Sequence, residues 1–133
     1  MRFMLLQNYG EVESGAPVIT EWDPEDVKAH IDFQIALNAE LTELGELVDA
    51  QGLTGPEQAK FVVWDGAGAP VVTDGPYPEA KELVAGYRMI DVETPERAIE
   101  IAARASAAPG PGGKPIRQAI EVRQVLSAVD PEM

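Results

Sequence analysis

The segment that decides the fold is a turn-rich loop between two apolar stretches, Asp74-Gly75-Pro76-Tyr77-Pro78-Glu79-Ala80-Lys81-Glu82. The side chain of an aspartate can form a hydrogen bond with the backbone two residues later in the chain. Glycine adopts backbone φ/ψ angles that are sterically disallowed for other residues, and proline fixes its own φ angle. Tyr77 precedes a second proline, which biases its backbone toward extended geometry. We therefore predict a stiff polar loop between two strands, and loops of this kind often hold ligands.

Strands and helices alternate on both sides of this loop. Proline follows a capping residue at Asp23-Pro24 and at Thr94-Pro95, and this pattern is typical of helix N-termini. Gly45 suits the end of the first helix, and glycines at 66 and 68 favour a hairpin. The sequence thus predicts helices over 24–44 and 95–107, and strands over 3–7, 47–51, 60–64, 71–73, 87–92 and 120–126.

This order predicts an α+β fold, a ferredoxin-like β-α-β-β-α-β arrangement with an inserted hairpin. Two helices can cover only one face of the sheet, yet the first strand carries apolar side chains on both: Phe3 and Leu5 on one side, Met4 and Leu6 on the other. We therefore expect a homodimer that is closed through the second sheet face. Residues 109–115, rich in glycine and proline, are expected to form an exposed connector.

Composition limits the class of protein and its partners. The 133 residues, of which 45% are hydrophobic and 25% charged, predict one globular domain over 1–133. No apolar run has the length of a membrane span or a secretory leader, so we expect a cytoplasmic location. The net charge of −13 argues against nucleic acid or membrane partners. The chain has no cysteine, which excludes disulfides and thiolate chemistry.

The first predicted helix carries a row of polar residues at four-residue spacing, His30, Gln34 and Asn38. Helical geometry places the row inside an apolar arc, with Val27 and Ile31 on one side and Phe33, Leu37 and Leu41 on the other. An unpaired buried polar group costs about 1–3 kcal/mol, so the row needs water, internal partners or a ligand. Both an internal network and a pocket wall fit this pattern.

His30 and Asp74 are the candidate catalytic residues. Histidine exchanges protons near neutral pH, and a carboxylate could orient the ring. A histidine on an apolar helix face is, however, more often structural than catalytic. The candidate ligand-binding residues include the rest of the polar row and three side chains that suit an anionic or phenolic substrate; together they are Gln34, Asn38, Tyr77, Lys81 and Arg88.

Other chemistries have no matching signature. The three serines lie in no nucleophile elbow, and no Walker loop or dinucleotide-binding glycine pattern follows a strand. One histidine without cysteine does not provide a usual zinc site, and the acidic residues lack calcium-loop spacing. We expect neither a metal nor a cofactor.

The loop over 74–82, followed by Gly86-Tyr87 and Ile90-Asp91-Val92, closely resembles the DGPF family within the YCII-related group. Tyr77 stands where that family usually has phenylalanine. The likeness extends over nearly the whole chain through 45–48, 52–53 and 121–123. It implies a dimeric α/β-barrel arrangement with a small-ligand cavity between helix and sheet.

The resemblance leaves two classes of function open. Some YCII-related proteins are thought to use a His–Asp pair, and one relative catalyses dehydrochlorination of an aromatic compound. This favours a cofactor-free lyase or isomerase with His30 as proton carrier. Other relatives are encoded near extracytoplasmic-function sigma factors, which favours a non-catalytic metabolite-binding protein or a regulatory partner of such a sigma factor.

Overall fold

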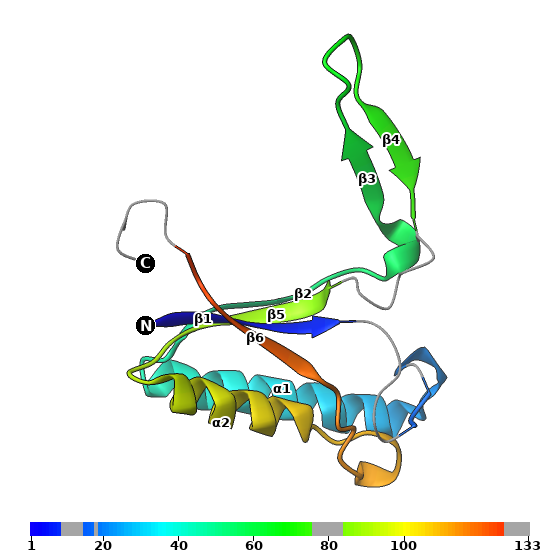
Figure 1. The fold of residues 1–133 in the computed structure, drawn as a ribbon. Coiled ribbons are helices and arrows are strands. Elements are labelled where there is room, and N and C mark those ends of the chain that lie inside the picture. The colour runs from blue at the N-terminus through cyan, green and yellow to red at the C-terminus, as the bar shows by residue number, and fades with distance from the viewer. Residues whose placement is uncertain (9–14, 18, 76–83, 127–133) are drawn as a thin grey trace.

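The computed structural model describes residues 1–8, 15–17, 19–75 and 84–126 and shows a mixed α+β architecture (Figure 1). Four strands form an antiparallel sheet in the order β2-β5-β1-β6, and two helices lie on one face of it. A separate hairpin of β3 and β4 projects away from the helices. In chain order the elements are β1 Arg2–Asn8, α1 Pro24–Glu43, β2 Leu47–Gly52, β3 Lys60–Val63, β4 Val71–Asp74, β5 Val84–Asp91, α2 Pro95–Ser106 and β6 Ile120–Gln124.

This order confirms the predicted sequence of strands and helices, and the local signals explain most boundaries. The Thr94 hydroxyl accepts a hydrogen bond from the backbone N–H of Arg97 at 3.1 Å and caps α2. Gly45 has a φ of +73°, a left-handed conformation that ends α1 at low cost. Asp23 occupies the N-cap position of α1 but makes no capping hydrogen bond with its side chain. Strand β5 starts earlier than predicted because Val84 already pairs with β1.

The core lies between the two helices and one face of the sheet. Phe3 and Leu5 point into it, whereas Met4 and Leu6 lie half-buried on the opposite face, as the alternation predicted. Helix α2 contributes three alanines and Ile101 to this core. Ile31 was expected in the inward arc of α1 but is 47% exposed. The buried members of the core are Phe3, Leu5, Leu37, Leu41, Ile90, Val92, Ala98, Ile101, Ala102 and Ala105.

The segment over 109–115 is exposed over 112–115, as its composition predicted, but it is not an irregular connector. It folds into a compact turn in which the Gly110 N–H donates to the Lys114 carbonyl at 2.7 Å. The chain then returns so that the Ile116 N–H donates to the Ala108 carbonyl at 2.8 Å. Ile116 and Ala108 pack with Trp22 in a second apolar cluster. The burial of this cluster anchors both ends of the turn, although its tip is exposed.

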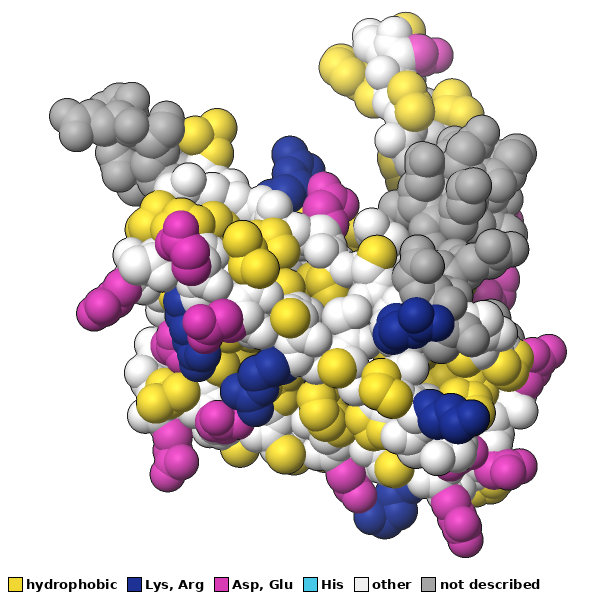
Figure 2. Space-filling model, turned by 60° about the horizontal axis from the view of Figure 1, so that its bottom comes forward, with side chains coloured by type: hydrophobic (Ala, Val, Ile, Leu, Met, Phe, Trp, Pro, Cys, Tyr) yellow, Lys and Arg dark blue, Asp and Glu magenta, His cyan; other side chains and the backbone are white. Residues whose placement is uncertain are grey.

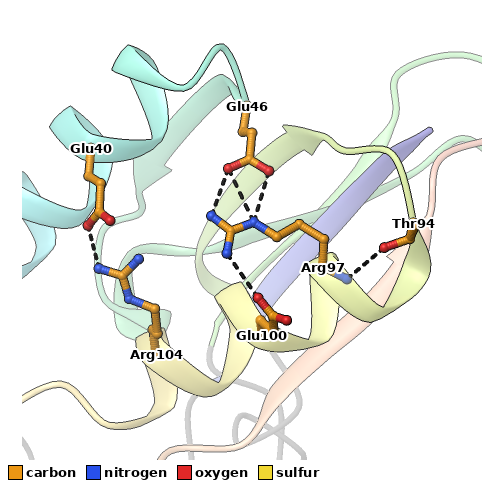
Figure 3. A network of polar contacts seen from close by, with 6 residues as sticks. All are labelled: Glu40, Glu46, Thr94, Arg97, Glu100 and Arg104. Atoms are coloured by element: carbon orange, nitrogen blue, oxygen red, sulfur yellow. Dashed lines mark hydrogen bonds and ion pairs between the residues drawn. The ribbon is translucent and has the colours of Figure 1, made fainter.

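Ion pairs connect α2 to α1 and to the start of β2 (Figure 3). The Arg97 guanidinium donates to the Glu46 carboxylate through Nη2 at 2.8 Å and through Nε at 2.9 Å. It also reaches Glu100 at 3.0 Å. Hydrogen bonding from Arg97 lowers the pKa of Glu46 below its ordinary value of 4.5. Nearby, Arg104 pairs with Glu40 in a more exposed position.

We predict that Arg97→Met lowers the free energy of unfolding at pH 7 by about 1–2 kcal/mol, because it leaves Glu46 without its charged partner. The folded-state pKa of Glu46 is lowered, so this stabilisation is complete above pH 4.5 and is lost as the pH falls through the lowered pKa. Urea unfolding at pH 7 and pH 3 measures the difference. Arg104→Met is the control and should have a smaller effect, and an equal loss at both pH values would contradict the assignment.

Candidate functional site

A cavity of about 210 Å³ lies between α1 and the sheet. Its wall combines side chains of α1 with residues of β1, β2 and β5. Sites for drug-sized ligands typically measure about 300–1,000 Å³, so this cavity suits a small molecule. The lining residues whose polar side chains lie on the helix side of the sheet are Gln7, His30, Gln34, Asn38 and Arg88. Gln51 and Tyr87 also border the cavity, but their side chains point to the opposite face.

The rotation of α1 brings its polar row over Arg88. His30, Gln34 and Asn38 are four residues apart and therefore share one helix face. Arg88 stands on β5, two residues before the core residue Ile90, and so points to the same side of the sheet as that residue. The structure thus brings together four of the site residues that the sequence suggested.

These four side chains form one continuous hydrogen-bond network. Arg88 donates through Nε to the Asn38 amide oxygen at 2.7 Å and through Nη2 to the Gln34 amide oxygen. The Gln34 amide nitrogen lies 3.3 Å from Nε2 of His30, and Nδ1 of His30 lies 3.0 Å from the Pro109 carbonyl oxygen. The network therefore runs from β5 through α1 to the compact turn.

The partners at the two ends of the network fix where its protons lie. The Pro109 carbonyl can only accept, so Nδ1 of His30 carries a proton and donates it. The Gln34 oxygen accepts from Arg88, so the amide group of Gln34 turns its nitrogen toward His30. Nε2 of His30 then accepts from Gln34. This assignment gives a neutral imidazole whose Nε2 lone pair is engaged.

Trp22 holds the imidazole from another side. The two rings meet edge to face, with centroids 5.4 Å apart and planes at 83°. The Trp22 indole N–H donates to the Pro17 carbonyl at 2.7 Å. The sequence analysis missed both Trp22 and Pro109. Trp22 precedes the N-cap and packs with Val27 in the first turn of α1, the hydrophobic-staple pattern that could have revealed it.

Asp74 occupies a different part of the molecule. It ends β4 in the projecting hairpin, is exposed, and binds Lys60 at 2.7 Å. The Lys60 ammonium lowers the pKa of the Asp74 carboxyl below its ordinary value. Asp74 does not line the described cavity, so the structure does not bring it together with His30. Tyr77 and Lys81 lie outside the described residues.

Tyr87 borders the cavity through its position on β5, but its side chain points to the opposite face of the sheet from Arg88. Its hydroxyl donates to the Asp49 carboxylate at 2.7 Å. This bond raises the pKa of Tyr87 and lowers that of Asp49. Among the described residues, no group of three histidine or acidic side chains is arranged to hold a metal ion. No helix in the same residues is long and apolar enough to cross a membrane.

The fold and the cavity define a small α+β domain with a polar pocket between its first helix and its sheet. The family model of the YCII-related domain matches residues 1–122. The chain therefore belongs to the YCII-related family, which confirms the resemblance found in the sequence. A comparison with curated proteins found no match.

We predict that neutral His30 carries its proton on Nδ1, because the Pro109 carbonyl has no proton to donate. Two-bond ¹H–¹⁵N correlation spectra at pH 9 distinguish the two ring tautomers. Gln34→Leu should keep the proton on Nδ1, since the bond to Pro109 remains in that variant. A proton on Nε2 in the parent would contradict the direction assigned to the network.

Proposed function

We propose that the protein binds a small organic molecule in the cavity between α1 and the sheet. The observation that carries this proposal is the network that holds Arg88 and Gln34 in fixed orientation at a cavity wall. Elsewhere in the same layer, α1 packs leucines against the sheet. Placing a cation and amides there instead costs folding free energy, and a ligand that pairs with them offsets that cost.

As an enzyme, the protein would act as a cofactor-free lyase or isomerase with His30 as proton carrier. The Pro109 carbonyl supports this role, since it fixes the tautomer and leaves Nε2 as the basic nitrogen. Gln34 occupies Nε2, so a substrate must first displace that amide. Small aromatic or carbonyl compounds are the substrates to test first.

Binding without turnover is the second candidate function. The observation in its favour is that both ring nitrogens of His30 already have partners. In this role the protein would bind a metabolite without converting it, or would act as a regulatory partner of an extracytoplasmic-function sigma factor. Such a protein shows ligand-induced stabilisation and no product formation.

We predict that a ligand found by thermal-shift screening of small metabolites is turned over, and that His30→Gln lowers kcat by about 10²–10⁴ while affinity persists. Glutamine keeps hydrogen bonding but does not exchange a proton near neutral pH. Lys28→Gln, at an exposed position of the same helix, is the control and should be neutral. Unchanged turnover and an unchanged pH profile in His30→Gln would favour the second function.

We also propose that two copies associate through the open sheet face in the dimeric α/β-barrel arrangement of a ferredoxin-like fold. Met4 lies beside Met89 and Arg123 on this face, and Leu6 lies beside Tyr87 and Glu121. The face therefore combines apolar bulk with balanced charge, which suits association of two acidic chains.

Hydrophobic side chains also gather on the projecting hairpin (Figure 2). Val62, Val63 and Trp64 are each at least 60% exposed. Val71 and Val72 on the paired strand are also exposed. A second copy on the open face would cover surface that is otherwise costly to leave in water.

We predict a homodimer in sedimentation velocity at micromolar concentration. Met89→Glu should weaken it at least about tenfold, because an unpaired carboxylate in an apolar interface costs several kcal/mol. Ile35→Glu, on the 60% exposed outer side of α1, is the control and should leave the dimer intact. Leu5 and Ile90 are core residues and do not test the interface. A parent that sediments as a monomer would contradict the proposal.

A further inference from the structure

Arg88 is a buried cation without an anionic partner among the described residues. Only 6% of its surface is exposed, and its hydrogen bonds among the described residues go to the neutral amides of Gln34 and Asn38. Burial lowers the pKa of Arg88 below its ordinary value, and no carboxylate counteracts this. Arg97, by contrast, has the carboxylates of Glu46 and Glu100 beside it.

The sheet register supplies no carboxylate to Arg88 either. Its cross-strand neighbours are Leu5 on β1 and Ala50 on β2, both apolar. The chain has 23 acidic side chains for 10 basic ones, so acids are abundant, yet the described lining of the cavity contains none. An isolated buried charge costs several kcal/mol unless something pairs with it.

The guanidinium also has donors that make no hydrogen bond among the described residues. It carries five N–H groups in a planar fork, and the contacts with Gln34 and Asn38 use only Nε and Nη2. Every fully enclosed side-chain nitrogen and oxygen in the described residues has a partner. Nη1 has no hydrogen bond there, so it keeps accessible surface, and Arg88 is one of the residues that line the cavity.

We infer that the ligand of this cavity carries a carboxylate, which pairs with Nη1 and Nη2 of Arg88. This inference rests on the proposed ligand-binding function and names the chemical class of the ligand. A planar fork matches the two oxygens of a carboxylate, and such paired hydrogen bonds are among the strongest in proteins. Asn38 and Gln34 hold the plane of the guanidinium in place. The small volume of the cavity restricts the ligand to a compact acid.

The test compares carboxylates with neutral amides of the same shape. Benzoate and acetate are titrated into the full chain beside benzamide and acetamide, at constant ionic strength, with calorimetry and thermal unfolding as readouts. Benzoate or acetate should bind at least about tenfold more tightly than its amide. Arg88→Lys should lose at least about tenfold in that affinity, because lysine lacks the fork. Arg97→Met is the matched control and should keep the affinity.

Ligand-free stability gives an independent readout. Arg88→Met removes an uncompensated charge, so its unfolding midpoint in anion-poor buffer should equal or exceed that of the parent. Arg97→Met, which breaks a paired charge, should lower the midpoint. A drop in Arg88→Met as large as that in Arg97→Met would show that a carboxylate of the protein itself pairs with Arg88, and would overturn the inference.

The remaining outcomes separate this inference from the proposed function. Should benzamide bind as tightly as benzoate, the cavity binds ligands but does not select carboxylates. Binding of inorganic phosphate without any carboxylate would also overturn the assignment. Should none of the acids, amides or phosphate bind, the carboxylate inference falls, while a neutral hit in a wider screen would still support the proposed function. The parent titrations need no variant, so a folding defect in Arg88→Met does not weaken the test.

Discussion

The packing of Leu37 and Leu41 against the sheet is the contact on which the rest of the structure depends. Both are essentially buried and belong to the same core as Leu5 and Ile90. They fix the rotation of α1, and the polar row of the helix then has only one direction available, toward Arg88. The apolar core and the polar cavity therefore lie at two ends of the same interface between α1 and the sheet, and the rotation of α1 about its axis determines the position of both.

Strand β5 therefore carries a residue whose burial stabilises the fold, Ile90, next to one whose burial destabilises it, Arg88. Ile90 lies in the core, and Arg88, two residues earlier on the same side of β5, extends into the cavity. The core holds the strand rigidly, so the guanidinium keeps its orientation even though its burial is unfavourable. Binding sites often lower the stability of the folded protein in this way, because side chains that are already ordered lose less entropy when a ligand binds.

Local signals predicted the elements and part of the candidate site. Caps, turn glycines and strand alternation depend on near neighbours, so the two helices, the strand order along the chain and the row of His30, Gln34 and Asn38 could be read directly. The proposed pairing of Asp74 with His30 depended on how the hairpin stands relative to the sheet, and no periodic pattern encodes that. Where Asp74 was expected to orient His30, the structure has the Pro109 carbonyl at Nδ1, a backbone group that residue types do not reveal.

The hydrogen-bond network also connects the two proposed roles of the cavity. Gln34 bonds Arg88 with its oxygen and His30 with its nitrogen, so the amide can leave one partner only by disturbing the other. Nη2 of Arg88 carries two N–H groups, so one can stay with the Gln34 oxygen while the other pairs with a carboxylate. Binding of an anion at Arg88 therefore does not by itself free Nε2 of His30. The proposed enzyme would need a further displacement of the Gln34 amide from His30, whereas the proposed binding function would not.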